Sequence, residues 1–292
     1  MQTRIMTSAC LTGATTDEFR LLRGLVYEKS GLWLGEEKKP FVEHKAFRRM
    51  KALGVPSFYG YYVILNDEEK GGAELLTFLD DLTINETSFF RNKPQLNFFA
   101  EAVLPEIISR KRSDGSCRIN IWSAGCSTGQ EPYTISIILN EAVPDLRSLR
   151  VNILASDLSL SALKIAQAGF YPTERMEGLE ARHVESCFRK TGNGYTVSGD
   201  IRKPVRFIHH NLLNDIIETG FDAVFCRNVL IYFDERTRDK AIRRFERAIV
   251  PGGWLFLGHS ETLHGIDADF EFFHHNKGTA YRKRESSGEA LG

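Results

Sequence analysis

Apolar residues recur at helical spacing through the first part of the chain, residues 15–83. Thr15 and Glu18 predict a capping box at the start of the first helix. A second helix follows, and Gly54 and Pro56 are expected to end it. The predicted buried stripe of this second helix consists of Val42, Ala46, Met50 and Leu53. Two further segments, SFYGYYVILN and AELLTFLDDLTIN, also favour helix, so the block is predicted to be a small all-α domain.

The periodicity changes after Arg118, where short strand-like runs alternate with helical ones. The strand candidates are RINIWSAG, VNILASD, VRFIHHNLL, FDAVFCRN and GWLFLGHSE; the helix candidates between them are EPYTISIILNEAV, SLSALKIAQAGF and ERTRDKAIRRFERAIV. This alternation predicts an α/β fold with a parallel sheet and helices on both faces. The run EFFHHNKGTAYRKR predicts a hairpin that adds an antiparallel edge to the sheet.

Two segments depart from this alternation. Residues 183–207 contain short β-like runs broken by GNG and SGD, which predict a small antiparallel β-subdomain inserted before the third strand. Residues 285–292 are polar and are predicted to be a disordered tail. The expected organisation is therefore a helical domain, 15–83, and a sheet domain, 84–284, that carries the insertion.

Composition narrows the class of protein. The 38 basic and 38 acidic residues balance, which argues against a bulk nucleic-acid or membrane-surface binder. The five cysteines are scattered and form no CxxC pair, as is usual in a reducing compartment. The start of the chain lacks an apolar signal region and no run approaches a membrane span, so we expect a cytoplasmic protein. The sequence contains two histidine doublets, His209-His210 and His274-His275. Adjacent residues on a strand point to opposite faces, so the two histidines of a doublet cannot bind one metal together, and we predict no metal site.

The segment SAGCSTGQE lies at the first strand-to-helix turn, where glycine lets the backbone approach a ligand closely. Gly125 and Gly129 give the spacing G-x-x-x-G, which lacks the dinucleotide fingerprint and makes a nicotinamide dehydrogenase the least favoured function. The turn alone is equally consistent with an ordinary tight turn. Glu131 follows it, where a carboxylate can face a ligand's ammonium group or stabilise the helix dipole.

Later strands end in residues that suit a nucleoside. Asp157 can accept hydrogen bonds from both ribose hydroxyls, although capping of the next helix is an equally simple role. Asn211 and Leu212 suit the edge and face of adenine, and Asn228 ends the next strand. Because ligands of open α/β sheets bind at the carboxyl ends of strands, these residues together predict an adenosine site with little need for phosphate binding. S-adenosylmethionine fits that description.

The chain also resembles the chemotaxis receptor glutamate methyltransferases, the CheR family, over about residues 15–284. The matching stretches are INETSFFRN, SAGCSTGQEPYTISI, ILASDLSLSALKIAQAGFY, FDAVFCRNVLIYFD and GGWLFLGHSETL. The resemblance implies a Rossmann-like class I methyltransferase sheet, preceded by an all-α domain and carrying a β-subdomain. It also implies transfer of a methyl group from S-adenosylmethionine to receptor glutamates, with S-adenosylhomocysteine as the product.

By the resemblance, eight residues fall on cofactor positions: Asn85, Thr87, Arg91, Glu131, Asp157, Asn211, Leu212 and Asn228. Arg91 and Tyr232 fall near the methyl-transfer centre, although Tyr232 is also consistent with a packed aromatic. The acceptor glutamate is already ionised at neutral pH, since its pKa is near ~4.3, so no general base is required. We therefore expect catalysis by positioning, with Arg91 holding either the acceptor or the cofactor carboxylate.

The partner implied by the resemblance is the glutamate-rich helices of chemoreceptors. Residues 38–51 hold six basic residues against one acid, and Lys45, Arg48 and Arg49 share one helical face, which we interpret as a steering surface. The β-subdomain offers a strand edge on which a receptor tail can dock. Two other functions stay open. One is a methyltransferase that acts on a small molecule or on RNA; the lack of a basic stripe with interleaved aromatic residues argues against RNA. The other is a non-catalytic scaffold that binds a nucleotide.

Overall fold

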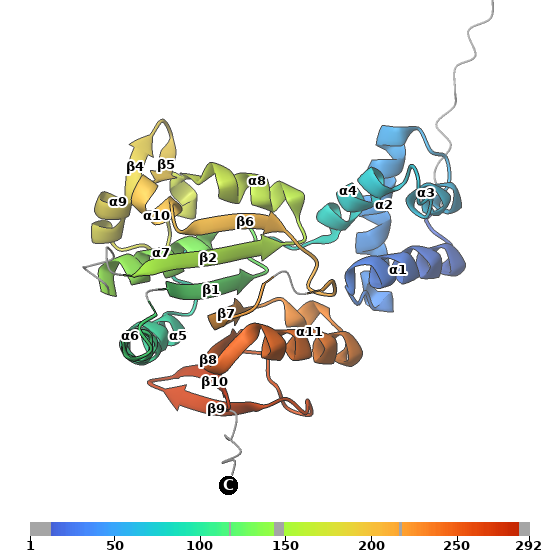
Figure 1. Cartoon of the computed structure of the whole chain (residues 1–292). Coiled ribbons are helices and arrows are strands. Elements are labelled where there is room, and N and C mark those ends of the chain that lie inside the picture. Colours follow the sequence, from blue (N-terminus) through green and yellow to red (C-terminus); the bar gives the residue numbers. More distant parts are fainter. Residues whose placement is uncertain (1–12, 117, 143–148, 216–217, 286–292) are drawn as a thin grey trace, which may run out of the picture. The chain divides into compact units, whose positions relative to one another are not determined.

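The computed structural model describes residues 13–116, 118–142, 149–215 and 218–285. It divides the chain into two compact units, unit 1 up to Thr83 and unit 2 from Ile84 (Figure 1). None of the described helices is long and apolar enough to cross a membrane.

The regular elements of unit 1 in the described residues 13–83 are all helices. Its elements are α1 Thr16–Ser30, η1 Glu36–Lys38, α2 Lys39–Leu53, α3 Phe58–Leu65 and α4 Gly72–Leu82. The predicted capping box is present: Thr15 Oγ1 accepts a hydrogen bond from the Glu18 amide, and Glu18 accepts one from the Thr15 amide. Gly54 ends α2 in the left-handed conformation, as predicted. The stripe of α2 is buried at three of its four positions, whereas Leu53, at the last turn, is 45% exposed.

Unit 2 is built on a seven-stranded sheet in the order β6-β2-β1-β7-β8-β10-β9. Its strands are β1 Arg118–Ala124, β2 Arg150–Asp157, β6 Val205–His209, β7 Phe221–Cys226, β8 Ile249–Leu257, β9 Phe270–His275 and β10 Gly278–Lys283. The first five in chain order are parallel, and β10 pairs antiparallel with both β8 and β9. The predicted sheet with an antiparallel carboxyl-terminal edge is confirmed. Strand order reverses between β1 and β7, the point where open α/β sheets bind ligands.

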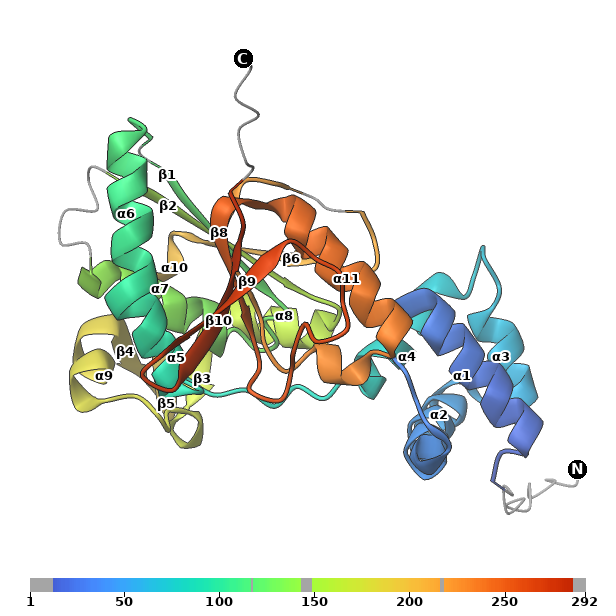
Figure 2. The ribbon, with the colours of Figure 1, turned by 90° about the horizontal axis from the view of Figure 1, so that it is seen from below.

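Both faces of this sheet are buried. Ile121 and Phe225 face a core that contains α5 (Lys93–Phe98), α6 (Leu104–Ser113) and α7 (Gln130–Ala142). Their neighbours Trp122 and Val224 face a core with α11 (Glu235–Ala248). Successive residues of a strand point to opposite faces, which is why β1 and β7 are buried at nearly every position. Figure 2 shows α6 and α11 on the two sides of the sheet. The flanking helices after the sheet begins are α7 Gln130–Ala142, α8 Leu160–Ala168 and α11 Glu235–Ala248.

A helical segment that the sequence analysis did not predict precedes β1. It consists of α5 Lys93–Phe98, η2 Phe99–Val103 and α6 Leu104–Ser113. Phe99, Val103 and Ile107 recur at four-residue spacing and are fully buried in the core shared with the sheet. This helical spacing was present in the sequence and is the signal that identifies the segment.

The β-subdomain begins earlier than the sequence suggested. Its sheet has the order β3-β5-β4, with β3 Phe170–Pro172, β4 Phe188–Thr191 and β5 Gly194–Val197. The three residues of β3 are too short a run to be read from periodicity. The subdomain also contains η3 Thr173–Arg175, α9 Ala181–Cys187 and α10 Gly199–Arg202.

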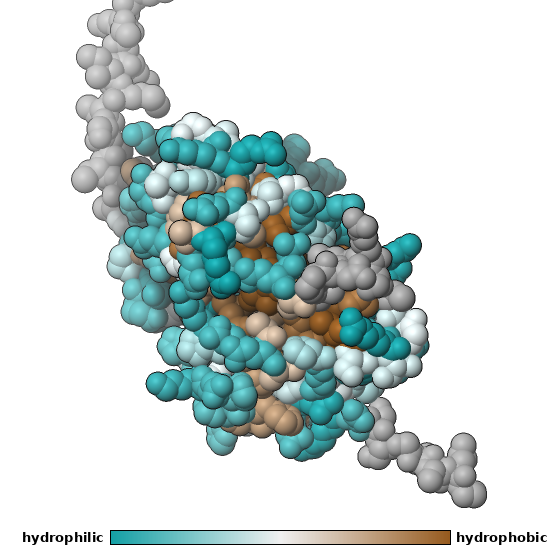
Figure 3. Space-filling model, turned by 90° about the vertical axis from the view of Figure 1, so that its left-hand side faces the viewer, coloured by the Kyte–Doolittle hydropathy of each residue, from teal (hydrophilic) through white to brown (hydrophobic). Residues whose placement is uncertain are grey.

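Figure 3 looks onto the side of unit 2 that includes α9; hydrophilic residues dominate this face and hydrophobic ones show between them near its middle.

Candidate methyltransferase site

The glycine turn joins β1 to α7 at the point where strand order reverses. Gly125 and Gly129 have φ values of 83° and 94°. A Cβ at Gly125 would lie 2.3 Å from Val229 Cγ2, and a Cβ at Gly129 would lie 2.8 Å from the Cβ of Ala166. Both glycines are therefore required by the close packing of the protein itself, in addition to their left-handed backbone.

Asp157, at the end of β2, organises the backbone around it. Its Oδ2 accepts a 2.7 Å hydrogen bond from the amide of Ser127, in the glycine turn, and its Oδ1 accepts a 2.8 Å bond from the amide of Ser159. The N-cap of α8 is Ser159, which accepts from the Ala162 amide, so the capping role considered for Asp157 belongs to its neighbour. Asp157 is 8% exposed and links the ends of two strands.

Asn85 brings the segment before α5 to the same place. Its Nδ2 lies 3.2 Å from Ser159 Oγ, and its Oδ1 lies 3.4 Å from Ser127 Oγ. Thr87 is half-buried on this segment between Asn85 and Arg91. Ser127 and Ser159 were not singled out by the sequence, although each lies within two residues of a predicted position.

Glu131, in the first turn of α7, forms an ion pair that the sequence did not reveal. Its Oε2 lies 3.2 Å from Nη1 of Arg227, and its Oε1 accepts a 2.7 Å bond from Ser123. Burial raises the pKa of Glu131, opposed by the charge of Arg227. Burial likewise lowers the pKa of Arg227, whose side chain is 4% exposed. Arg227 also donates to the main-chain oxygen of Arg91, so this pair connects α7, the end of β7 and the Arg91 segment.

Arg91 and Tyr232, the two residues expected near methyl transfer, lie within electrostatic reach of one another. Burial is the main cause that raises the pKa of Tyr232; the charge of Glu86 raises it further and that of Arg91 opposes this. Arg91 is exposed and donates a 2.8 Å bond to the Glu86 carbonyl oxygen. Tyr232 ends η4 Leu230–Tyr232 and is half-buried, so its phenol is not enclosed in the core.

The remaining predicted residues follow β6 and β7. Leu212 is 8% exposed and contributes to the core cluster beneath the site. Asn211 Oδ1 accepts a 2.9 Å bond from the Leu213 amide. Asn228 has a left-handed backbone with φ 61°, and its amide donates to Glu261, a residue after β8 that the sequence analysis did not select. All eight predicted cofactor positions are thus in unit 2, on segments that meet around the carboxyl ends of β1, β2, β6 and β7.

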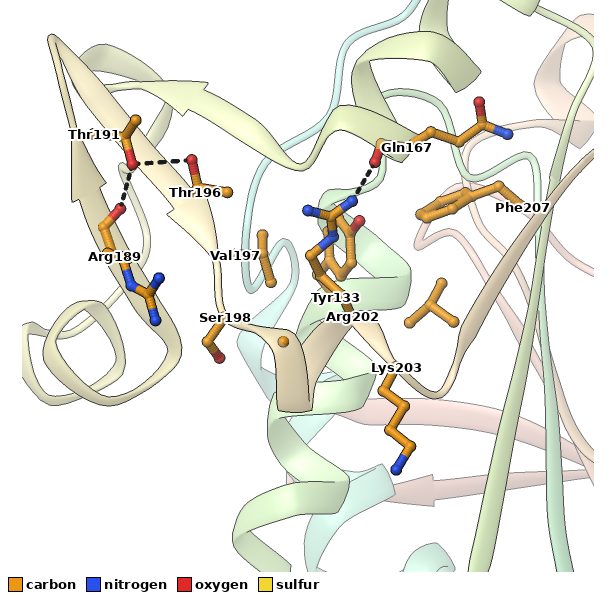
Figure 4. Close-up of a pocket in the computed structure, with 12 residues that line it drawn as sticks. Tyr133, Gln167, Arg189, Thr191, Thr196, Val197, Ser198, Arg202, Lys203 and Phe207 are labelled. Carbon is orange, nitrogen blue, oxygen red and sulfur yellow. Dashed lines mark hydrogen bonds between the residues drawn. The ribbon is translucent and has the colours of Figure 1, made fainter.

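A separate cavity of about 590 Å³ lies between the β4–β5 hairpin, α10, β6 and α7 (Figure 4). Its walls include the apolar Val197 and Phe207 and the cations Arg189, Arg202 and Lys203, and none of the described residues that line it is acidic. Arg202 donates a 2.7 Å bond to the Gln167 carbonyl oxygen. In the described residues, no group of three or more His, Cys, Asp or Glu side chains is arranged to hold a metal ion.

Comparison with known proteins identifies the family of the chain. The sequence model of the CheR methyltransferase SAM-binding domain matches residues 85–279, and that of the CheR all-alpha domain matches residues 17–83. Chemotaxis protein methyltransferase 2 of Vibrio cholerae is 36% identical over 92% of this chain and 93% of its own length. Chemotaxis protein methyltransferase 1 of Pseudomonas aeruginosa is 36% identical, covering 93% of this chain and 99% of its own. The Escherichia coli chemotaxis protein methyltransferase is 33% identical, covering 86% of each. The chain therefore belongs to the CheR methyltransferase family and is an S-adenosylmethionine-dependent methyltransferase.

Proposed function

We propose that this enzyme methylates glutamate side chains on chemoreceptors and so acts in chemotaxis adaptation. The observation that carries the proposal is the meeting of Asp157, Glu131 and Arg227 at the strand ends, with Arg91 and Tyr232 at the rim. The relatives' names support a role in chemotaxis, and the exposed Arg91 suits a carboxylate acceptor better than a neutral one.

The residues at the strand ends suit the parts of S-adenosylmethionine. Asp157 would accept from the ribose, and Asn211 and Leu212 would contact adenine. Glu131 offers a carboxylate to the ammonium group, because a carboxylate has about four lone-pair sites and the Ser123 and Arg227 contacts use two of them. Asn85, Thr87 and Asn228 are the remaining proposed cofactor contacts. Arg91 would bind a carboxylate of the cofactor or of the acceptor.

The cofactor, when bound, supplies a methyl group on a sulfonium, which is a good leaving group. The protein then has to align the acceptor oxygen with that methyl group and exclude water. Tyr232, whose raised pKa keeps its phenol neutral, can donate a hydrogen bond at the rim. Arg91 can orient one oxygen of the acceptor, leaving the other to attack.

The experiment is transfer of label from tritiated S-adenosylmethionine to receptor-containing membranes. Label on the receptor that is released by mild base identifies a glutamate methyl ester and supports the proposal. Base-stable label on another molecule would assign the enzyme a different acceptor. Calorimetry that finds no binding of S-adenosylhomocysteine would instead favour the non-catalytic scaffold.

We further propose that the β-subdomain docks an acidic receptor tail at the cavity of Figure 4. The three cations of the cavity and its apolar wall suit a peptide that carries carboxylates and a hydrophobic side chain. Arg189 and Lys203 are exposed, so they are accessible to such a peptide.

The basic face of α2 is proposed to steer the acidic receptor helices, with roles that differ among its residues. Arg49 forms a two-bond contact with Glu74 of α4, and Tyr61 donates to the same carboxylate, which indicates a structural role for Arg49. Arg48 is paired with Asp81, but its side chain remains 58% exposed. Lys45 lies over the Phe41 ring and is half-buried. Steering therefore rests mainly on Lys45 and Arg48.

A further inference from the structure

The carboxylate of Glu261 accepts backbone hydrogen bonds from two different segments. Its Oε2 accepts from the amide of Asn228 at 2.9 Å and from the amide of Gly258 at 2.5 Å. Its Oε1 lies 3.3 Å from the amide nitrogen of Ile231, one residue before Tyr232. One side chain thus connects the end of β8 with both ends of the loop that follows β7.

This loop, residues 227–232, needs such support. Asn228 adopts a left-handed backbone at φ 61°, a conformation that costs of the order of 1 kcal/mol for a residue other than glycine and persists where surrounding contacts enforce it. Leu230 anchors the middle of the loop in the core, whereas Asn228 and Tyr232 are half-buried and outside it.

Two glycines allow their segments to pack closely against this loop. A Cβ at Gly125 would lie 2.3 Å from Val229 Cγ2 on one side of the loop. A Cβ at Gly258 would lie 2.9 Å from the Asn228 nitrogen and 2.6 Å from Glu261 Oε2 on the other. The backbone of the loop is therefore held between the glycine turn and the end of β8, with the Glu261 carboxylate filling the space beside it.

We propose that Glu261 is a positioning residue for the methyltransferase reaction: by binding the Asn228 and Ile231 amides it fixes Asn228 toward the adenosine and Tyr232 toward the methyl group. This role rests on the proposed contacts of Asn228 and Tyr232. Glu261 acts through these two residues, and no contact of its own with either substrate is required.

The test compares Glu261→Ala and Glu261→Gln in the full-length enzyme, using S-adenosylhomocysteine calorimetry and steady-state methylation of receptor-containing membranes. Glu261→Ala leaves up to three amides without an acceptor, so we expect the Kd to rise about tenfold or more and kcat to fall by a similar factor. Glu261→Gln keeps one acceptor oxygen and should recover part of both losses. The KM for receptor should stay within about twofold, because the docking cavity is untouched.

The matched control is Glu246→Ala. Glu246, half-buried on α11, also accepts a backbone hydrogen bond, from the Asp269 amide nitrogen at 2.9 Å. Its removal should leave Kd and kcat unchanged. If Glu261→Ala does not fold, Gly258→Ala serves in its place, because the added methyl group would lie 2.6 Å from Glu261 Oε2 and 2.9 Å from the Asn228 nitrogen, so it breaks the same contact and should produce the same two defects.

Wild-type Kd and kcat in folded Glu261→Ala, or in Gly258→Ala, would overturn the positioning role. Asn228→Ala separates this failure from a failure of the proposed contacts. If Asn228→Ala weakens S-adenosylhomocysteine binding and Glu261→Ala does not, the inference about Glu261 is wrong. If Asn228→Ala also has no effect, Asn228 is not a cofactor contact and the assigned site is wrong.

Discussion

The strand-end site and the cavity beside the β4–β5 hairpin use charge in opposite ways. At the strand ends, the acids are already engaged by the protein: Asp157 binds two amides, Glu131 pairs with Arg227, and Glu261 binds three amides. At the hairpin, Arg189 and Lys203 are exposed, and the cavity has no acid among the lining residues that the structure describes.

The difference matches the ligands proposed for the two regions. A site whose polar groups are fixed before binding is preorganised for one rigid ligand and loses little entropy when that ligand arrives. Exposed cations around an apolar wall can instead adapt to a flexible acidic chain, and their attraction falls with salt. Changes at the strand ends should therefore affect cofactor affinity and stability, whereas changes at the hairpin should affect receptor affinity.

The largest effect is expected from Arg227→Met. The buried Glu131 carboxylate then loses its cation, which should cost about 3–5 kcal/mol of the free energy of unfolding. Because Arg227 lowers the pKa of Glu131, its loss raises that pKa further. The folded state then holds a proton that the unfolded state releases, so stability should fall as pH rises from about 4.5 through the raised pKa. Urea unfolding between pH 4.5 and 8 measures this.

The double variant Glu131→Gln/Arg227→Met is the control for that prediction. It removes both charges, so most of the lost stability and all of the added pH dependence should be recovered. A double variant as unstable as Arg227→Met would show that the contact between Arg227 and the Arg91 carbonyl oxygen, and not the ion pair, accounts for the loss.

Asp157→Ala should have the next largest effect, a strong loss of cofactor affinity. It removes the proposed ribose contact and leaves the Ser127 and Ser159 amides without their acceptor, at about 1–3 kcal/mol for each unpaired group, so a rise in Kd of about 100-fold or more is expected. Calorimetry with S-adenosylhomocysteine measures it. Asp239→Ala, which breaks an exposed pair with Arg243 on α11, should leave Kd unchanged. An unaltered Kd in Asp157→Ala would remove the basis of the proposed site.

Reversal of charge at the hairpin cavity should have a smaller effect, and it should change the KM for the receptor and not the affinity for the cofactor. Arg189→Glu/Lys203→Glu should raise the KM for a receptor with an acidic tail by about tenfold, with S-adenosylhomocysteine affinity unchanged. Lys164→Glu, on exposed α8 outside the cavity lining, is the matched control. An equal effect on a receptor from which the tail has been deleted would contradict docking at this cavity.

The smallest effect is expected on α2. Lys45→Glu/Arg48→Glu should slow methylation by a few-fold at low salt, and the difference should vanish near 0.5 M salt, where charges are screened within about 4–5 Å. Arg20→Glu on α1, 59% exposed, is the control. Arg49→Glu is a different experiment, because it places a second carboxylate beside Glu74 and should lower the melting temperature of unit 1. A salt-independent loss of rate would exclude steering.

The sequence predicted the parts of this fold that depend on local periodicity. The order of strands and helices after Arg118 and the caps of α1 and α2 follow from patterns within about 15 residues. The α5–α6 segment was missed although its four-residue spacing was visible, and β3 was missed because a three-residue strand carries no period.

The prediction of the site was also limited to what local sequence patterns reveal. Residues that end strands could be identified, because parallel strands bring their carboxyl ends to one edge. Arg227 and Glu261 could not be selected as partners of Glu131 and Asn228, because each contact joins residues more than 30 positions apart. Arg227 stands beside Asn228 in the motif CRN, however, and a buried strand end followed by an arginine suggests an internal acid.

Two buried cysteines can report local opening of this enzyme near the proposed site. Cys126 and Cys226 are buried beside Ser127 and Arg227, and burial raises the pKa of both thiols, so alkylating reagents should reach neither in the closed molecule. The rate at which each cysteine is labelled, measured for each peptide by mass spectrometry, would report how often the strand ends open transiently. Repeating the measurement with bound cofactor would show how far the cofactor slows this opening, with no engineered probe.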